Sequence, residues 1–368
     1  MRAVTEETKL VAPWTTLLFL IHPIQTETVT YISGRASGLM AFWYLLALFL
    51  YIKASEDTSG HVIRRRYRSG ALLCFILSVA SKEPAVTFPL ALLLWDVVVR
   101  RLRGARLREA IIAEHTPFWL AVLAAGVLAW QHPRYADLAQ FSLNIRPLWE
   151  NALSELHAVS YALLLFICPW KQNFDHDLPL LHTLIEWPLP LDLLVWCGLT
   201  VAAFISIRRL PLLSFGIGWF VLQILPTTVL PRNDLLSERN LYLASLGILL
   251  AAVVLGSYLT HRIAQVLERP SWFGISVGAV ELAMVVALCV STMHRNALYH
   301  NPVLLWSDSV AKSPRKARPH NNLGYALSRR GEWDPAIEEF RIAVRLDPAY
   351  ELAQQNLRDA YLRQVGRQ

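Results

Sequence analysis

Residues 241–260 read LYLASLGILLAAVVLGSYLT, an uncharged run that is long enough to cross a bilayer as one helix, which needs about 20 apolar residues. Because the bilayer core contains no water, each crossing segment must satisfy its own backbone N–H and C=O groups, and a helix does this alone. The sequence therefore predicts an all-α fold built around a polytopic helical membrane domain. Further apolar blocks lie at residues 10–21, 36–52, 70–81, 85–99, 116–130, 152–169, 188–207, 211–230 and 272–293.

The composition of the 368-residue chain supports this class. Charged residues make up 17% and hydrophobic residues 54%, with a mean hydropathy of +0.36, whereas soluble domains carry about 25% charged residues. The net charge of +7 lies mostly in short loops, so it indicates membrane topology and not nucleic-acid binding. The four cysteines fall inside apolar blocks and lack the spacing of a zinc site or a disulfide framework.

Lysine and arginine in short loops predict how the helices are oriented. Fourteen of them lie in loops 53–69, 100–110, 208–210 and 261–271, which are assigned to the cytoplasm. The opposite loops hold seven and are assigned to the extracytoplasmic side; they are 22–35, 81–84, 131–187 and 231–240.

Block 152–169 does not fit a simple alternation of spans. If it crossed the membrane, Arg208 and Arg209 would lie on the wrong side, so it is predicted to be re-entrant or interfacial, which is tolerated beside a water-filled cavity. Block 272–293 then leaves the membrane on the extracytoplasmic side. The tail after Met293 is expected there too, because segments longer than about 60 residues translocate largely regardless of charge.

The tail contains a tetratricopeptide-type repeat. Residues 317–348, ARPHNNLGYALSRRGEWDPAIEEFRIAVRLDP, match the 34-residue helix–turn–helix pattern. One full repeat at about 317–350, with a partial repeat on either side, predicts a helical module at 295–368 after a membrane domain at 1–294. Such a module binds a protein or peptide in a groove, and the alternative role is a spacer. The residues assigned to the groove are Asn321, Asn322, Leu323, Gly324, Ala336, Phe340, Ala343 and Pro348.

Polar residues gather at the predicted extracytoplasmic ends of the apolar blocks. Ionisable groups near the hydrocarbon edge persist where they face a cavity or pair with one another. One interpretation is a shared polar cleft, and the alternative is a set of self-neutralising pairs, Lys82 with Glu83 and Glu238 with Arg239. A divalent metal stays open, although adjacent positions rarely place three side chains on one ion. The clusters are His22, Pro23, Glu27, Ser33, Gly34 and Arg35; Ser81, Lys82, Glu83 and Pro84; His132, Pro133, Arg134 and Asp137; Asp175, His176 and Asp177; and Glu238, Arg239, Asn240 and Tyr242.

Four strings, followed by the repeat, carry a family resemblance: HPIQTETVTYISGRASGLMAFWYLLALFLY, SKEPAVTFPLALLLWD, FDHDLPL and SERNLYLASLG. Together they resemble the transmembrane and tetratricopeptide repeat-containing proteins, which belong to the C-type superfamily of polyprenyl-phosphate-sugar-dependent glycosyltransferases. The resemblance implies that a sugar, mannose if the chain is O-mannosyltransferase-like, moves from a polyprenyl- or dolichyl-phosphate donor to a protein or glycan acceptor. Transfer is expected on the extracytoplasmic face.

The resemblance also implies roles for the polar clusters. Arg239, Lys82 and Arg35 are the cations expected to bind the donor phosphate. Glu83 and Glu27 are the carboxylates expected to accept the proton of the acceptor hydroxyl. Further substrate contacts are expected from His22, Tyr242, Asp175, His176 and Glu238.

Members of the family carry a catalytic Asp in the first extracytoplasmic loop, which here would lie upstream of Met1. The apolar run at 10–21 follows an acidic head and lacks a cleavage site, so it is interpreted as a short or truncated first span and not as a signal peptide. The chain is expected to be a truncated enzyme or a non-catalytic, membrane-anchored scaffold for protein–protein interaction. A transporter is disfavoured because the polar clusters lie at segment ends. The short tail favours the bacterial inner membrane over the endoplasmic reticulum.

Overall fold

The computed structural model describes residues 6–56, 60–229, 231–268 and 271–365, and these contain helices and no strand. Arg269, one of the predicted cytoplasmic cations, lies outside the described residues. Within the described ranges, six helical segments are long and apolar enough to cross a membrane. They are residues 32–56, 104–131, 189–206, 211–228, 238–266 and 272–299. The predicted polytopic, all-α membrane fold is confirmed.

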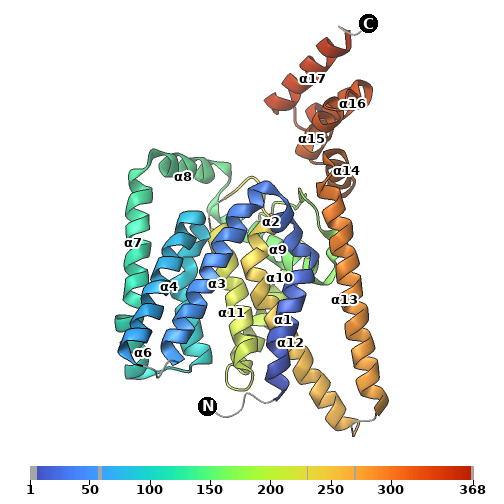
Figure 1. Cartoon of the computed structure of the whole chain (residues 1–368). Helices are drawn as coiled ribbons and strands as arrows, with labels where there is room; N and C mark the ends of the chain where they lie inside the picture. The colour runs from blue at the N-terminus through green and yellow to red at the C-terminus, as the bar shows by residue number, and fades with distance from the viewer. Residues whose placement is uncertain (1–5, 57–59, 230, 269–270, 366–368) are drawn as a thin grey trace.

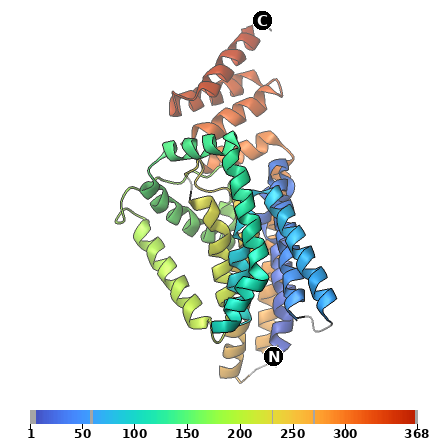
Figure 2. The same cartoon turned by 90° about the vertical axis from the view of Figure 1, so that its left-hand side faces the viewer.

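The membrane domain is a bundle whose helices run up and down along one axis (Figure 1). Its main helices are α1 (Glu6–Ile21), α3 (Arg35–Glu56), α4 (His61–Ser81), α5 (Phe88–Leu94), α7 (Thr116–Gln131), α9 (Leu148–Ile167), α10 (Leu189–Ser206), α11 (Pro211–Thr228), α12 (Leu241–Val266) and α13 (Ser271–Tyr299). The start of α1 and the end of α17 (Glu351–Val365) lie at opposite ends of the molecule in both views (Figure 2).

Small residues let the central helices approach closely. A Cβ added at Gly216 of α11 would lie 2.4 Å from the carbonyl oxygen of Gly247 in α12, and a Cβ at Gly247 would lie 2.4 Å from that of Gly216. Close backbone contact of this kind drives helix association in lipid, where apolar burial contributes little. Beside it, the buried rings of Tyr44, Phe88 and Trp219 pack edge to face and connect α3, α5 and α11.

The two ends of the bundle differ: one carries most of the loop arginines, and the other adjoins the C-terminal module. The arginine end holds the close of α3, the start of α4 and α6 (Gly104–Ala110), and the module end holds α2 (Thr26–Thr30), α8 (Pro133–Ile145) and the start of α14 (Pro302–Lys312) (Figure 1). Residues 53–69 were predicted to be a loop, which is wrong, since α3 continues to Glu56 and α4 begins at His61. The arginines of this stretch therefore lie on a helix.

Helix α9 has both of its ends at the module end. Near its start, the Asn151 amide donates to the carbonyl of Thr228, where α11 finishes. At its other end, His22 Nε2 lies 3.1 Å from the carbonyl of Phe166, and His22 directly follows α1. Helix α9 is also absent from the six candidate spans. This geometry agrees with the predicted re-entrant or interfacial segment at 152–169.

The tail forms α14, α15 (Ala317–Ser328), α16 (Trp333–Leu346) and α17, which continue upward from α13 (Figure 1). Leu323, Ala336 and Phe340 are buried together, and a Cβ on Gly324 would lie 2.8 Å from the Phe340 ring. The close packing of α15 on α16 therefore explains why the repeat has Leu-Gly at 323–324 and Ala and Phe at 336 and 340.

The predicted groove residues are mostly not in a groove. Five of the eight are buried where α15 packs against its neighbours: Leu323, Gly324, Ala336, Phe340 and Ala343. The positions that define the repeat pattern are those that pack between helices. Three of the eight have other positions: Asn321 is buried and accepts from the Asn356 amide, Pro348 is exposed before α17, and Asn322 lines a cleft.

Candidate functional site

A tight turn at the module end places Glu27 inside the protein. After α1, His22 Nδ1 accepts from the backbone N–H of Ile24 and starts the short helix Pro23–Gln25, which leads into α2. The chain then folds back so closely that a Cβ on Gly34 would lie 2.4 Å from the carbonyl oxygen of Glu27. Burial lowers the pKa of His22 against the opposing effect of the Phe166 carbonyl, which favours the neutral imidazole.

Glu27 is a buried carboxyl without a close cationic partner. One oxygen accepts from the backbone N–H of Arg239 at 3.0 Å, and the other accepts from Ser237 Oγ at 3.3 Å. The Arg239 Nε atom lies 3.8 Å away. Burial, followed by the negative charge of Glu238, raises the pKa of Glu27 to about 7. A carboxyl that titrates near neutral pH is suited to accept or release a proton.

Glu238, unlike Glu27, has a close cationic partner. It is fully buried, with Arg295 Nη2 at 2.8 Å, His176 Nε2 at 3.0 Å and the Asn173 backbone N–H at 2.7 Å. The predicted pair between Glu238 and Arg239 is wrong, because Arg295 of α13 takes the carboxylate. Sequence reasoning missed Arg295, whose only signal was an arginine just after an apolar block.

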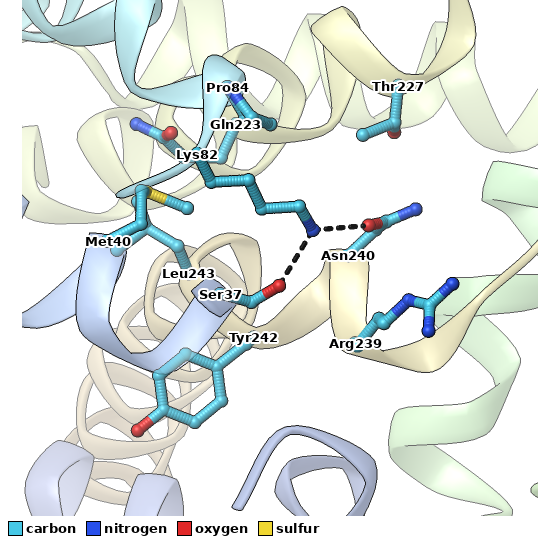
Figure 3. A pocket seen from close by; sticks show the side chains of 10 residues that line it. All are labelled: Ser37, Met40, Lys82, Pro84, Gln223, Thr227, Arg239, Asn240, Tyr242 and Leu243. Atoms are coloured by element: carbon cyan, nitrogen blue, oxygen red, sulfur yellow. Dashed lines mark hydrogen bonds between the residues drawn. The ribbon is translucent and has the colours of Figure 1, made fainter. Parts of the chain in front are cut away.

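Lys82 lies between α3 and α12 and binds uncharged oxygens (Figure 3). Its Nζ atom donates to Ser37 Oγ at 2.7 Å and to Asn240 Oδ1 at 3.2 Å. Burial, together with the charges of Arg239 and Arg232, lowers the pKa of Lys82 to about 8. The predicted pair with Glu83 is wrong, because Lys82 points inward while Glu83 is exposed at the start of the next short helix.

A small pocket forms around this lysine. Figure 3 shows the Lys82 amine pointing toward Ser37 and Asn240, with Arg239 and Tyr242 nearby. Asn240 belongs to a predicted cluster, but Ser37 and Gln223 were missed, since a serine or glutamine inside an apolar block leaves no recognisable pattern. The lining residues are Ser37, Met40, Lys82, Pro84, Gln223, Thr227, Arg239, Asn240, Tyr242 and Leu243.

The structure brings some predicted residues together and separates others. Lys82, Arg239 and Tyr242 line one pocket, and Glu27 adjoins it through Arg239. Arg35 and Glu83 are exposed and do not line the pocket. The third predicted cluster, His132, Arg134 and Asp137, is exposed on and beside α8 and stays apart.

Asp175 and His176 belong to the joint between the module and the membrane domain. Asp175 pairs with Lys316 and, at 2.5 Å, with Arg318, while His176 pairs with Glu238. Arg318 also binds Asp234 at 2.8 Å, and this contact and that of Lys316 lower the pKa of Asp234 although burial opposes them. The structure thus places Asp175 and His176 in ion pairs of this joint and outside the lining of the pocket at Lys82.

Metal ligation finds no support in the described ranges, where no group of three or more His, Cys, Asp or Glu side chains could hold an ion. Asp175 and His176 are occupied as described above, and Asp177 lies 4.0 Å from Arg315. The donor set of the pocket is an amine, a guanidinium and neutral polar groups, which suits an anion and not a cation.

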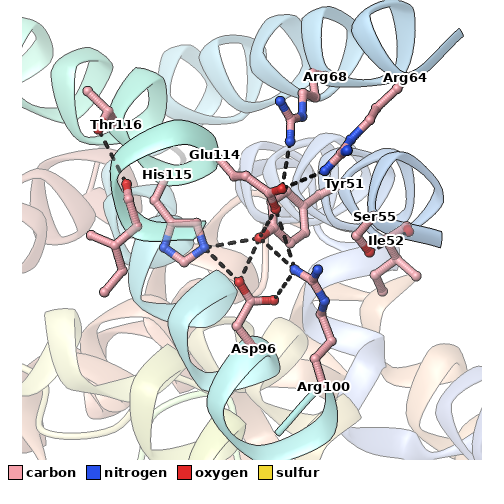
Figure 4. Close-up of polar contacts among 11 residues, drawn as sticks. Tyr51, Ile52, Ser55, Arg64, Arg68, Asp96, Arg100, Glu114, His115 and Thr116 are labelled. Atoms are coloured by element: carbon pink, nitrogen blue, oxygen red, sulfur yellow. Dashed lines mark hydrogen bonds and ion pairs between the residues drawn. The ribbon is translucent and has the colours of Figure 1, made fainter. Parts of the chain in front are cut away.

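A second buried polar cluster occupies the arginine end (Figure 4). Arg64 and Arg68 of α4 bind the Glu114 carboxylate at 2.8 and 2.6 Å. Glu114 lies in a π-helical turn, Ile111–His115, and such turns often occur where a side chain must be redirected. The sequence treated these arginines as markers of topology, and the structure shows that they also tie helices together.

The remainder of this cluster surrounds Asp96, whose side chain is fully buried. Arg100 binds Asp96 at 2.9 Å, the Tyr51 hydroxyl donates to it at 2.7 Å, and His115 Nε2 lies 3.0 Å away. Each oxygen of the carboxylate has a partner. The cluster therefore connects α3, α4 and the π-helical turns Trp95–Val99 and Ile111–His115.

Comparison with known proteins identifies relatives of one kind. No protein-family model and no solved structure matches the chain. The chain is 26% identical over 380 residues to protein O-mannosyl-transferase Tmtc3 of Drosophila melanogaster (90% of this chain, 40% of the relative). It is 25% identical over 344 residues to a protein O-mannosyl-transferase of Caenorhabditis elegans (91% and 46%).

A third similar protein is protein O-mannosyl-transferase TMTC4 of Mus musculus, which is 24% identical over 366 residues (89% of this chain and 48% of the relative). The chain thus spans less than half the length of these curated relatives. Its homologues are protein O-mannosyl-transferases of the transmembrane and tetratricopeptide repeat-containing family, which confirms the resemblance predicted from the sequence.

Proposed function

We propose that the chain acts in a membrane glycosyltransferase that moves a sugar from a polyprenyl- or dolichyl-phosphate donor to a hydroxyl of a protein or glycan acceptor. The observation that carries the proposal is the pocket that both Lys82 and Arg239 line, with Glu27 beside Arg239. The names of the relatives specify O-mannosyl transfer to protein, and we extend mannose and a protein acceptor to this chain as part of the proposal.

Each residue has a role that follows from its surroundings. The Lys82 amine and the Arg239 guanidinium bind the donor phosphate by charge-assisted hydrogen bonds. The acceptor oxygen attacks the anomeric carbon, the bond from that carbon to the phosphate oxygen breaks, and the phosphate leaves with the electron pair. Glu27 takes the proton of the acceptor hydroxyl, for which a pKa of about 7 is well placed.

Donor binding and sugar transfer test the proposal together. The chain in lipid nanodiscs is titrated with dolichyl phosphate and then supplied with dolichyl-phosphate mannose and acceptor peptides. Arg239→Ala is expected to weaken donor binding, whereas Lys171→Ala removes an exposed cation outside the pocket and is expected to leave it unchanged. Equal donor binding by both variants, or no donor binding at all, contradicts the proposal.

The pocket and the module are proposed to face the extracytoplasmic side. The support is the arginine excess at the opposite end. A cysteine introduced by Glu83→Cys is expected to react with a membrane-impermeant maleimide in intact cells, with the unaltered chain as background. Labelling that requires permeabilised cells reverses the orientation. Fractionation of the native host distinguishes a bacterial inner membrane from the endoplasmic reticulum, where the same face is lumenal.

A non-catalytic scaffold is the second function considered. The observation in its favour is the ion-paired joint of Asp175 and Asp234 with Lys316 and Arg318, which holds the module against the membrane domain. A scaffold requires a partner at the module and no donor in the pocket, so binding of dolichyl phosphate at Lys82 and Arg239 separates the two functions.

A further inference from the structure

A cleft of about 520 Å³ lies where the module meets the membrane domain. Its walls come from the segment after α2, the loop before α10, the end of α13, and helices α14 and α15. A volume within the range of about 300–1,000 Å³ is typical of ligand sites. No role assigned above uses this cleft, and it is much larger than the pocket at Lys82.

One side of the cleft is a set of aromatic rings, from the membrane domain, the end of α13 and α14, that support one another. The ring of Phe174 meets Tyr31 at 5.0 Å, Tyr299 at 5.9 Å and Trp306 at 5.1 Å between centroids, each edge to face. Rings held in this way present an apolar surface that does not have to be ordered when a ligand binds. The surface favours a large apolar or aromatic group.

The module side of the cleft is one face of α15. Asn322 and Tyr325 of α15 and the following residue Arg329, whose backbone is still helical, are spaced by three and four residues, so they share a helix face. Tyr325 is 54% exposed, and Arg329 is exposed and makes no ion pair with any described residue. Arg330 adds a second guanidinium, which donates to Asn301 at 2.6 Å and lies 4.0 Å from the Glu332 carboxylate. The rim of the cleft is therefore cationic.

The cleft adjoins the candidate site through a few residues of chain. Tyr31 directly follows α2, which carries Glu27, and Arg239 Nη1 donates to Ser33 Oγ at 3.2 Å. A ligand lying on Tyr31 is thus close in sequence and in space to the carboxyl proposed to accept a proton.

We propose that this cleft binds the acceptor polypeptide as an extended, acidic segment with an aromatic or large apolar side chain on the ring surface and acidic side chains on Arg329 and Arg330. A neutral hexose lacks the anion that the arginines require, and a free phosphate lacks the apolar group that the rings require. An acidic polypeptide carries both. The direction toward Glu27 rests on the proposed glycosyltransferase function, whereas binding itself does not.

The test uses the whole chain in lipid nanodiscs and a fluorescent synthetic peptide in which one Phe is flanked by Asp residues. Binding is followed by anisotropy without any donor. Arg329→Glu and Tyr325→Ala are each expected to weaken binding by about tenfold, since arginine and tyrosine dominate such contacts. Arg345→Glu makes the same charge change on the exposed side of α16 and is expected to leave affinity unchanged.

Matched peptides sharpen the result. Replacing Asp by Lys is expected to remove the loss of binding caused by Arg329→Glu, and replacing Phe by Ala is expected to remove the loss caused by Tyr325→Ala. The inference is overturned if wild type does not bind, if Arg345→Glu weakens binding as much as Arg329→Glu, or if the lysine peptide binds equally well. Peptide binding without sugar transfer leaves the cleft as a polypeptide site and removes the glycosyltransferase proposal, so the two failures are distinct.

Discussion

Two buried polar clusters, one at each end of the bundle, differ in how closely their charged groups are paired with opposite charges. At the arginine end, Glu114 has guanidinium groups at 2.6 and 2.8 Å, and Asp96 has one at 2.9 Å. At the module end, Glu27 has a guanidinium only at 3.8 Å, and Lys82 binds uncharged oxygens. A fully paired buried charge holds helices together, whereas a buried charge without a matched partner is available to a ligand.

At the module end, neighbouring charges of the same sign shift the pKa values of Glu27 and Lys82 further. Glu238 adds to the effect of burial in raising the pKa of Glu27, and Arg239 and Arg232 add to burial in lowering the pKa of Lys82. Such neighbours make both groups more costly to hold in their charged forms. Strongly perturbed groups in a pocket are a physical mark of functional sites, which is why the chemistry is assigned to this end.

The largest expected effect is on the arginine end. Asp96→Ala leaves Arg100, His115 and Tyr51 without their shared partner, and removing one member of a buried ion pair costs about 4 kcal/mol. The free energy of unfolding in mixed micelles measures this loss. Asp96→Asn keeps a hydrogen-bond acceptor and is expected to lose less of the free energy of unfolding. An Asp96→Ala protein as stable as wild type would show that the cluster does not stabilise the fold.

The next effect concerns Glu27 and pH. Its folded-state pKa is raised from 4.5 to about 7, so between these values the folded protein holds a proton that the unfolded chain has released. Stability should therefore fall as pH rises through this window, by up to about 3 kcal/mol, and the loss is complete above about pH 7.

The Glu27→Gln variant isolates this effect because it cannot titrate. The free energy of unfolding of wild type relative to Glu27→Gln, measured at about pH 5 and about pH 8, should be lower at the higher pH. A difference that is constant with pH would mean that Glu27 is as well paired as the carboxylates of the arginine end.

A smaller effect is expected from Lys82→Ala on donor binding. The loss of one charge-assisted contact to a phosphate weakens binding of dolichyl phosphate by about 2 kcal/mol. Folding stability should change less than in Asp96→Ala, since Lys82 leaves behind only the neutral Ser37 and Asn240. Lys82→Arg serves as the control that keeps the charge. A stability loss as large as that of Asp96→Ala would make Lys82 a structural residue.

The smallest effect is expected at Glu83, which the sequence grouped with Glu27 as a catalytic carboxylate. Glu83 is exposed and does not line the pocket, so Glu83→Gln should change stability by no more than about 0.5 kcal/mol and leave donor binding intact. A large loss of sugar transfer in Glu83→Gln would instead restore it as a catalytic candidate.

The sequence by itself determined the class of the fold and part of the site. Uncharged runs such as residues 241–260 require helices in lipid, and the Leu323–Gly324 and Ala336…Phe340 pattern predicts a helix pair that packs closely. The arginine excess predicted one set of helix ends, and Lys82, Arg239 and Tyr242, which lie near the opposite ends, do meet in one pocket.

Only the tertiary structure decided which charge meets which. Both predicted pairs joined neighbours in the chain, Lys82 with Glu83 and Glu238 with Arg239, whereas the observed partners are distant in sequence. Asn240 binds Lys82, and Arg295 binds Glu238. Helical turns send adjacent side chains in different directions, so the pairing of buried charges depends on how separate helices pack and not on local spacing.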